Sequence, residues 1–164
     1  MVLIKGPLIL FMSKNCDYWA VCLSIAFSMA IGCSDGRPSR VPVAGQVLID
    51  GQPLKYGTVR FIPNDARMSG SMLDSDGRFT LSCFDKGDGA VIGVHQVIIA
   101  AGESISPTRV RWHAPKKYSE LATSGLKQEI TGPNDSLVIQ LTWDGGKPFV
   151  ETVEGEDDSK KPGS

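Results

Sequence analysis

The stretch Val43-Ala44-Gly45-Gln46-Val47-Leu48-Ile49-Asp50-Gly51 decides the fold class of this chain. Its apolar residues Val43, Val47 and Ile49 alternate with polar or small ones, and a period of two places them on one face of a β-strand. Asp50-Gly51 follows directly, and an Asp-Gly pair after an alternating run is a strong signal for a hairpin turn. The stretch therefore predicts a strand that ends in a tight turn.

The same pattern of short alternating runs and turns continues along the chain. We expect further strands over residues 58–63, 70–74, 78–83, 94–101, 126–131 and 136–143, with a second Asp-Gly turn at Asp76-Gly77. The run 94–101 is the most apolar and is expected to be central, whereas residues 102–125, with Pro107 and Pro115, are expected to be long and irregular. Seven or so short strands separated by turns predict an all-β fold, a single Greek-key β-sandwich over residues 43–143.

Several of these turn and core motifs occur in an order that resembles a known class of domain. They are Gly45-Gln46-Val47, Asp50-Gly51-Gln52-Pro53-Leu54, Gly57-Thr58-Val59-Arg60-Phe61, Asp74-Ser75-Asp76-Gly77-Arg78-Phe79 and Gly93-Val94-His95-Gln96-Val97. The series resembles the carboxypeptidase regulatory-like, transthyretin-like β-sandwich, and more narrowly it is similar to small lipoproteins of planctomycete bacteria. Because turn and core motifs specify a fold rather than a reaction, the resemblance implies little about chemistry.

The N-terminal residues 1–32 are interpreted as a lipoprotein signal peptide, with Met12 as an alternative start. The apolar run 19–31 has the length of a signal-peptide core and is shorter than the ~20 residues that span a bilayer. Met29-Ala30-Ile31-Gly32-Cys33 resembles a lipobox, and this resemblance implies that Cys33 becomes the first residue and carries fatty acyl chains such as palmitate. The alternatives are a plain secretory signal that is cut nearby and an uncleaved N-terminal anchor.

Two flanking segments complete the predicted organisation. Residues 33–42 are polar and contain Pro38 and Pro42, so we expect a tether between the membrane and the domain. Residues 144–164 form an acidic tail that is expected to be disordered. Ser34 follows the cysteine in place of Asp, which favours the outer membrane by the sorting rule of enteric bacteria. The predicted location is the cell envelope, with the domain facing the periplasm or the surface.

Composition excludes one class of partner and predicts the state of the cysteines. The chain has 17 Lys and Arg against 18 Asp and Glu, a formal net charge of −1, so we expect no nucleic-acid partner. Cys16 and Cys22 would leave with the signal peptide, and Cys33 would be lipidated. Cys83 would remain without a disulfide partner, and its parity with Phe79 and Leu81 predicts a buried, inert thiol.

Metal sites and cofactors are not expected. Asp74, Asp76, Asp85 and Asp88 could suggest calcium, but Arg78 stands where an EF-type loop needs another oxygen ligand, so a hairpin turn is favoured. His95 and His113 are the only histidines, and no second His or Cys lies at the spacing of a zinc site. His95 shares a strand face with Val97 and Ile99, which predicts a packed core position.

A catalytic role is also not expected. The chain has no Gly-x-Ser-x-Gly elbow. The hydroxyisourate hydrolases among transthyretin-like sandwiches carry a C-terminal Tyr-Arg-Gly-Ser signature, whereas this chain ends in Lys161-Pro162-Gly163-Ser164. A small-metabolite hydrolase is kept as an alternative, and it requires a pocket in which His95 or His113 lies beside a basic residue.

One stretch is a candidate binding site, residues 109–118. It contains Arg109, Arg111, Trp112, His113, Lys116, Lys117 and Tyr118. Basic groups interleaved with aromatic rings can hold an anionic polymer, a sugar or a lipid headgroup. The alternative is that Trp112 and Tyr118 pin a loop onto the sandwich while the lysines are solvated.

The predicted function is that of a membrane-anchored envelope lipoprotein acting as a non-catalytic binding or structural module. Its expected partners are the membrane, through the lipid anchor, and an envelope polymer or protein. An accessory domain of a larger envelope complex is a further alternative.

Overall fold

The computed structural model describes residues 36–152. The predicted signal peptide, the lipidation site Cys33 and the end of the predicted tail, residues 153–164, lie outside the described residues. Contacts divide the chain into the units Met1–Arg37 and Pro38–Ser164, and the fold below is that of the second unit. No helix among residues 36–152 is long and apolar enough to cross a membrane.

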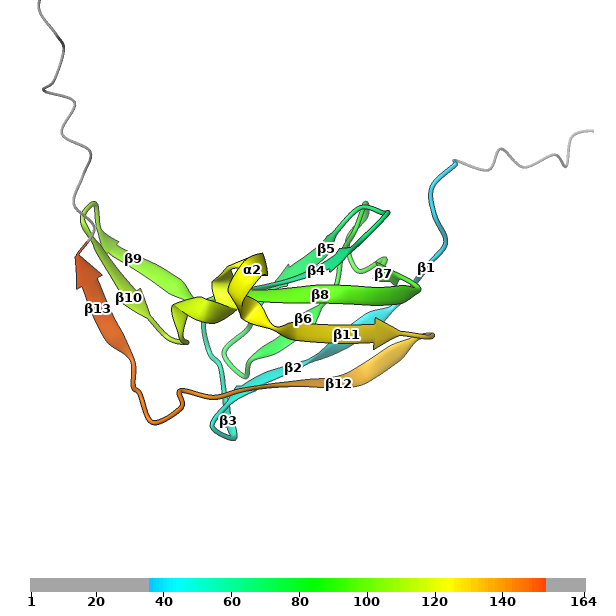
Figure 1. Ribbon diagram of the computed structural model, residues 1–164. Coiled ribbons are helices and arrows are strands. Elements are labelled where there is room, and N and C mark those ends of the chain that lie inside the picture. Colours follow the sequence, from blue (N-terminus) through cyan, green and yellow to red (C-terminus); the bar gives the residue numbers. More distant parts are fainter. Residues whose placement is uncertain (1–35, 153–164) are drawn as a thin grey trace, which may run out of the picture. The chain divides into compact units, whose positions relative to one another are not determined.

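The domain is built almost entirely of short strands, which confirms the all-β prediction (Figure 1). Residues 36–152 contain thirteen strands, more than the seven or so expected. They are β1 (Arg40–Val41), β2 (Val43–Ile49), β3 (Gln52–Pro53), β4 (Thr58–Pro63), β5 (Ser69–Met72), β6 (Arg78–Thr80), β7 (Ala90–Val91), β8 (Gly93–Ala100), β9 (Gly102–Ser106), β10 (Arg109–Trp112), β11 (Leu126–Ile130), β12 (Asn134–Leu141) and β13 (Phe149–Thr152). One turn of 3₁₀-helix, η2 (Lys116–Ser119), and one of α-helix, α2 (Leu121–Ser124), lie between β10 and β11.

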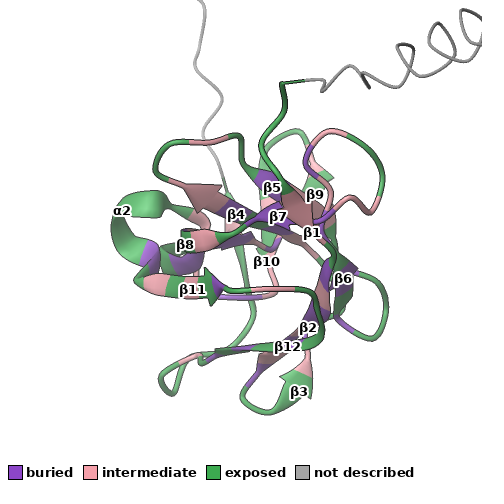
Figure 2. Ribbon diagram, turned by 90° about the vertical axis from the view of Figure 1, so that its right-hand side faces the viewer, coloured by how far each residue is buried: buried purple, intermediate pink, exposed green. Residues whose placement is uncertain are grey.

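Two sheets form the layers of the sandwich. One has the antiparallel order β11-β8-β4-β5, and the other has the order β12-β2-β3 with β6 also paired to β2. Their apolar side chains meet in one core, which includes Val59, Phe61, Val97 and Ile99 from the first sheet and Val43, Val47, Leu137, Ile139 and Leu141 from the second. Figure 2 shows these buried segments in β2, β4 and β8, with exposed residues at the turns.

The stretch that predicted the fold behaves as expected. Val43, Val47 and Ile49 of β2 are buried, and the residues between them are more exposed except Gly45. Asp50 and Gly51 both have positive φ, 47° and 78°, and Ile49 pairs with Gln52 across the turn. This is the arrangement of a two-residue hairpin turn of the kind that favours Asp-Gly.

β8 is the central strand that the apolar run predicted. It lies between β11 and β4 in the first sheet. His95 on this strand is fully buried, which confirms its core position, and its ring packs edge-on against Phe61 at 5.8 Å between centroids. His95 Nε2 lies 2.9 Å from the Val91 carbonyl oxygen. Because a carbonyl can only accept, Nε2 carries the proton of this ring.

The last core strand, β12, runs parallel to β2, a direction that the alternation pattern does not reveal. Leu137 lies opposite Gly45, and Leu141 lies opposite Ile49. The two backbones approach so closely at this point that a Cβ on Gly45 would lie 2.1 Å from the Leu137 carbonyl oxygen. The pairing therefore requires glycine at position 45.

The prediction of a long irregular segment over residues 102–125 is wrong, and so is the predicted start of the disordered tail. Residues 102–112 form β9 and β10, and β10 also pairs with β13, which lies within the predicted tail. Asp144 and Gly145, with φ of 50° and 83°, form a second tight turn that leads towards β13. These strands were missed because they are short and have no buried residues, so they depend on pairing with one another rather than on a face that packs in the core.

The predicted tether, residues 33–42, is also shorter than expected. Arg40 and Val41 form β1 and pair with Val91 and Ala90 of β7. Arg40 Nε lies 2.8 Å from Asp88 Oδ2, and both side chains are largely buried. The chain is thus fastened to the domain from Arg40 onwards.

The partly buried carboxylate of Asp88 organises the loop that Arg40 contacts. Burial by itself raises the pKa of Asp88, but hydrogen bonds from the amides of Cys83, Asp85 and Phe84 and the charge of Arg40 outweigh it, so the pKa is lowered overall. The closest of these amides, that of Cys83, is 2.6 Å from Oδ1. The Arg40 guanidinium also lies over the Phe84 ring at 4.8 Å. Asp88 therefore joins β1 and this loop through both charge and backbone hydrogen bonds.

The parallel pairing of β12 with β2 can be tested by a matched pair of glycine substitutions. Gly45→Ala should lower the free energy of unfolding by about 1–3 kcal/mol, because the added methyl group is forced against the Leu137 backbone. Gly132→Ala, where an added Cβ meets nothing within 4 Å, should change it by less than about 0.5 kcal/mol. Urea denaturation measures both, and equal stability of the two variants would contradict this pairing.

The attachment of β1 can be tested by a double-mutant cycle. Arg40→Met and Asp88→Asn should each destabilise the domain, and the cycle should show a coupling of about 1 kcal/mol because the pair is partly buried. Asp135→Asn changes an exposed carboxylate that forms no ion pair with residues 36–152, so it serves as the control. Additive effects of the Arg40 and Asp88 substitutions would show that β1 is not held by this contact.

Candidate functional site

The predicted binding residues fall on two neighbouring elements. Arg109, Arg111 and Trp112 lie on β10, the central strand of the sheet β13-β10-β9, and Lys116, Lys117 and Tyr118 lie on η2. β9 follows β8 after Ala101, and the His113 amide donates to the Ala101 carbonyl at 2.9 Å. The sheet therefore extends from one end of the sandwich, at the opposite end from β1 and β7 (Figure 1).

Alternation along β10 divides its side chains between two faces. Arg111 shares one face with its cross-strand partners Glu103 and Val150. Trp112 shares the other face with Phe149 of β13 and Gly102 of β9. A Cβ on Gly102 would lie 3.2 Å from the Trp112 ring, so this small residue makes room for the indole.

On the face of the sheet that carries Arg111, the carboxylate of Glu103 contacts two basic groups. Glu103 Oε2 lies 2.9 Å from His113 Nε2 and 3.4 Å from Arg111 Nη1. The hydrogen bond from His113, followed by the charge of Arg111, lowers the pKa of Glu103 below its ordinary value. The Tyr56 ring packs against the His113 ring at 5.1 Å. Glu103 was not predicted as a site residue.

On the second face, Glu151 of β13 holds two of the predicted residues. Its carboxylate accepts a hydrogen bond of 2.9 Å from Trp112 Nε1 and one of 3.0 Å from Lys116 Nζ. The contact with Lys116, and then that with Trp112, lowers the pKa of Glu151. The Lys116 ammonium also lies 5.4 Å from the centre of the Trp112 ring. Glu151 thereby fixes the orientation of both side chains.

The remaining predicted residues lie against the turn after β12. Lys117 Nζ forms an ion pair with the Asp144 carboxylate, and this contact raises the pKa of Lys117. Tyr118 is buried in the core, and its hydroxyl lies 3.4 Å from the carbonyl and 3.3 Å from the amide of Thr142. Tyr118 thus has the pinning role of the alternative interpretation and presents no free ring to a ligand.

Three aromatic side chains lie next to one another and are here called the aromatic row: Trp112, Phe149 and Trp143. Trp112 and Phe149 are direct cross-strand partners, and the Phe149 and Trp143 rings meet edge to face at 6.5 Å. Phe149 is 42% exposed, while the two tryptophans are half-buried. The row therefore offers an apolar surface that the surrounding polar groups border.

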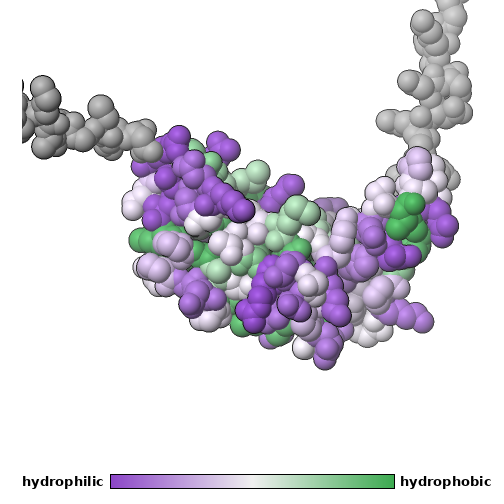
Figure 3. Space-filling model, turned by 180° about the vertical axis from the view of Figure 1, so that it is seen from behind, coloured by the Kyte–Doolittle hydropathy of each residue, from purple (hydrophilic) through white to green (hydrophobic). Residues whose placement is uncertain are grey.

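Residues outside the predicted stretch complete this site: Glu103, Trp143, Asp144, Phe149 and Glu151. A signal for one segment was present, because Phe149-Val150-Glu151-Thr152 alternates as a strand does. The face of the domain shown in Figure 3 carries hydrophobic atoms in small groups bordered by hydrophilic ones. The apolar side chains exposed on the three strands include Ile105 and Val150.

Two of the acidic residues that could suggest calcium, Asp74 and Asp88, accept hydrogen bonds from backbone amides of their own loops. Asp74 Oδ1 accepts hydrogen bonds of 2.8 Å from the amides of both Asp76 and Arg78. Asp88 holds the loop described above. Across residues 36–152, no group of three or more His, Cys, Asp or Glu side chains is placed to hold a metal ion. The hydrogen bonds of Asp74 with residues 76–78 confirm the predicted hairpin turn at Asp76-Gly77.

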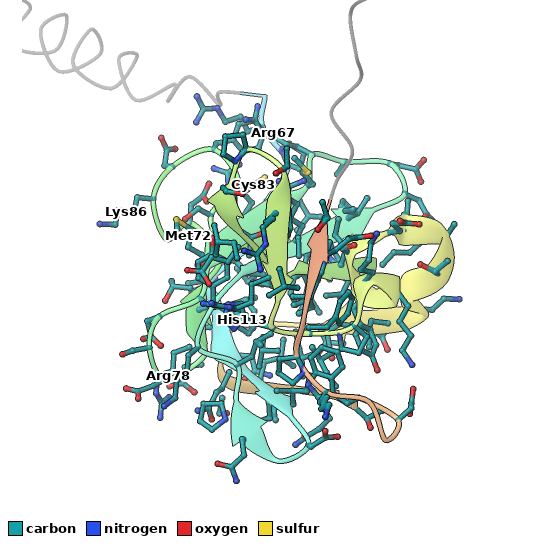
Figure 4. All side chains as sticks on the ribbon, turned by 90° about the vertical axis from the view of Figure 1, so that its left-hand side faces the viewer. Arg67, Met72, Arg78, Cys83, Lys86 and His113 are labelled. Atoms are coloured by element: carbon teal, nitrogen blue, oxygen red, sulfur yellow. The ribbon has the colours of Figure 1, made fainter. Side chains whose placement is uncertain are left out.

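Cys83 is buried, as its parity predicted. It is 7% exposed, and its thiol lies 3.6 Å from the Arg67 carbonyl oxygen, which it can reach as a donor. Figure 4 shows Arg67 and Cys83 close together on the side where the described chain begins.

The two histidines lie in different parts of the domain. His95 lies near the start of β8, whereas the His113 amide is hydrogen-bonded to the carbonyl of Ala101, six residues further along the chain. Six residues of extended strand span about 20 Å. An open groove of about 1020 Å³ lies elsewhere, lined by Met72, Arg78 and Lys86 among others. Neither histidine lines it, and Figure 4 shows the three labelled groove residues along one side of the domain.

Comparisons with known proteins identify no relative. A scan against protein-family models, a search of curated proteins and a search of solved structures each returned no match.

The pairing of Glu103 with His113 predicts a specific titration. His113→Phe keeps a ring beside Tyr56 but removes the hydrogen bond, so the pKa of Glu103 should rise towards 4.5. In the same variant the pKa of Glu151 should stay low, because its partners are unchanged. Carboxyl-carbon NMR titration measures both groups. Since the folded-state pKa of Glu103 is depressed, its stabilising contribution is present above the unfolded pKa and is lost as pH falls through the folded value. A Glu103 pKa that does not respond to His113→Phe would contradict the assignment.

Proposed function

We propose that this chain is a lipid-anchored protein of the bacterial cell envelope, and that its β-sandwich is a non-catalytic binding module. The lipobox-like Met29-Ala30-Ile31-Gly32-Cys33 after a short apolar run supports the anchor. Acylation with more than one chain would hold the protein firmly, since each buried methylene contributes about 0.8 kcal/mol. The turn and core motifs support membership of the carboxypeptidase regulatory-like, transthyretin-like class.

The observation that carries the binding role is the sheet β13-β10-β9. Most of its side chains are exposed or half-buried, so neither face is sealed by the core. The aromatic row lies on one face with the Lys116–Glu151 pair beside it. Rigid groups that combine an apolar surface with fixed hydrogen-bonding partners are suited to recognition.

The position of this sheet suits a protein held at its N-terminus. Seven residues, 34–40, connect Cys33 to the end of Arg40, and they reach at most about 25 Å. Arg40 pairs with Val91, which lies just before β8 begins. β9 begins after the other end of β8, and the eight residues of β8 span about 27 Å. The anchored end and the binding end of the domain would therefore be opposite.

The site of action follows from the anchor. Ser34 after the lipidated cysteine favours the outer membrane, with the domain facing the periplasm or the surface. The binding partner would be an envelope polymer or an envelope protein that meets the membrane-distal end of the domain.

The anchor is tested with two cysteine variants. The N-terminal peptide of protein purified from its native membrane should begin at Cys33 and carry acyl mass. Cys33→Ser should abolish the acyl mass and release the protein from the membrane fraction, whereas Cys83→Ser, the matched control at a buried position, should change neither. Mass spectrometry of the peptide and cell fractionation measure the two effects. An unmodified N-terminal peptide in the wild-type protein would refute the anchor.

A further inference from the structure

The candidate site is nearly neutral where a ligand would lie. Lys116 is paired with Glu151 at 3.0 Å, Lys117 with Asp144, and Arg111 with Glu103 at 3.4 Å. Of the four predicted cations, only Arg109 forms no ion pair within residues 36–152. An anionic polymer would therefore meet three carboxylates beside these cations and only one unpaired cation, Arg109. The surface is unsuited to binding through charge.

The charged groups are paired with one another, whereas the aromatic row is open to solvent at its centre. Phe149 is 42% exposed although Trp112 and Trp143 adjoin it. Both neighbours of Phe149 are held in place. Trp112 donates a hydrogen bond of 2.9 Å to Glu151. Trp143 packs against the core, and its amide donates to Asp50 Oδ1 at 3.3 Å. A rigid aromatic surface loses little conformational entropy when it binds a partner.

The polar groups at the border of the row can both donate and accept hydrogen bonds. Lys116 and Lys117 are donors, and the carboxylates of Glu151 and Asp144 are acceptors. Because these four groups neutralise one another, they offer hydrogen bonds without attracting a net charge. Such a border fits a ligand that carries many hydroxyl groups.

From this combination we infer that the aromatic row binds a neutral polysaccharide, an inference that rests on the binding role proposed for this sheet. A pyranose ring presents an apolar face of C–H groups and a rim of hydroxyls. The C–H face would pack on the exposed Phe149 ring, with the Trp143 ring standing edge to face beside it, and the hydroxyls would bond to the Lys116–Glu151 and Lys117–Asp144 pairs. Binding through ring packing and neutral hydroxyls would depend little on salt.

The experiment uses the full-length, acylated protein in detergent and isothermal titration calorimetry. The neutral probes are dextran, laminarin and hydroxyethyl cellulose, and the anionic probes are polygalacturonate and heparin. At least one neutral polymer should bind, with a Kd that changes less than about twofold between about 50 and about 500 mM NaCl. Phe149→Ala and Trp143→Ala should each weaken binding at least about tenfold.

Two further variants separate ring packing from folding. Phe149→Leu keeps an apolar side chain for packing but removes the flat ring, so it should also weaken binding while the domain stays folded. Tyr56→Ala removes an aromatic side chain of similar exposure, 40%, that lies outside the row, and it should bind as the wild type does. Unchanged binding by Phe149→Leu and Trp143→Ala would overturn the inference.

The remaining outcomes distinguish this inference from the proposed function. Binding of only the anionic polymers, steeply weakened by salt and by Arg109→Ala, would overturn the neutral ligand while the binding module stands. Failure of every polymer to bind, with Cys33 acylated, would overturn the polysaccharide ligand, but it would leave intact the membrane anchor and the proposal that the sheet binds an envelope protein.

Discussion

The parallel pairing of β12 with β2 is the contact on which the rest of the domain depends. It places Leu137, Ile139 and Leu141 in the core opposite the first sheet, and it is possible only because Gly45 has no side chain. It also determines where the chain goes next. Since β12 runs in the same direction as β2, its end lies beside the Asp50-Gly51 turn, where the Asp50 amide donates to the Leu141 carbonyl at 3.0 Å. From there Trp143 and Asp144 reach the candidate site, and β13 can pair with β10.

The chemistry of the candidate site is determined by pairing rather than by composition. In the sequence, residues 109–118 are strongly basic, because their acidic partners lie elsewhere. In the fold, Glu103 arrives from β9, Asp144 from the turn after β12 and Glu151 from β13. Exposed ion pairs of this kind add little stability. Their effect here is to orient side chains and to cancel charge, and what remains open is the aromatic row.

Several polar groups that resemble functional residues are used by the fold itself. Asp74 caps a hairpin turn, Asp88 gathers three backbone amides and Arg40, and His95 donates to a carbonyl inside the core. Asp88 and His95 thereby satisfy backbone groups that are partly or fully buried, where a missing hydrogen bond is costly. The only two histidines of the chain are thereby separated, one in the core and one on the extending sheet.

The sequence by itself determined the elements whose signals are local. Alternation in Val43–Ile49, the Asp50-Gly51 and Asp76-Gly77 turns, the central apolar strand and the buried positions of His95 and Cys83 all follow from periods and turn chemistry within a few residues. The tertiary structure alone decided the direction of β12, the docking of Arg40, and the three-stranded sheet of the candidate site. β9, β10 and β13 are short and bury little, and the sheet is complete only when β13 pairs with β10 across about 40 residues of sequence. Their partners, and the charges that those partners neutralise, exist only once the chain has folded.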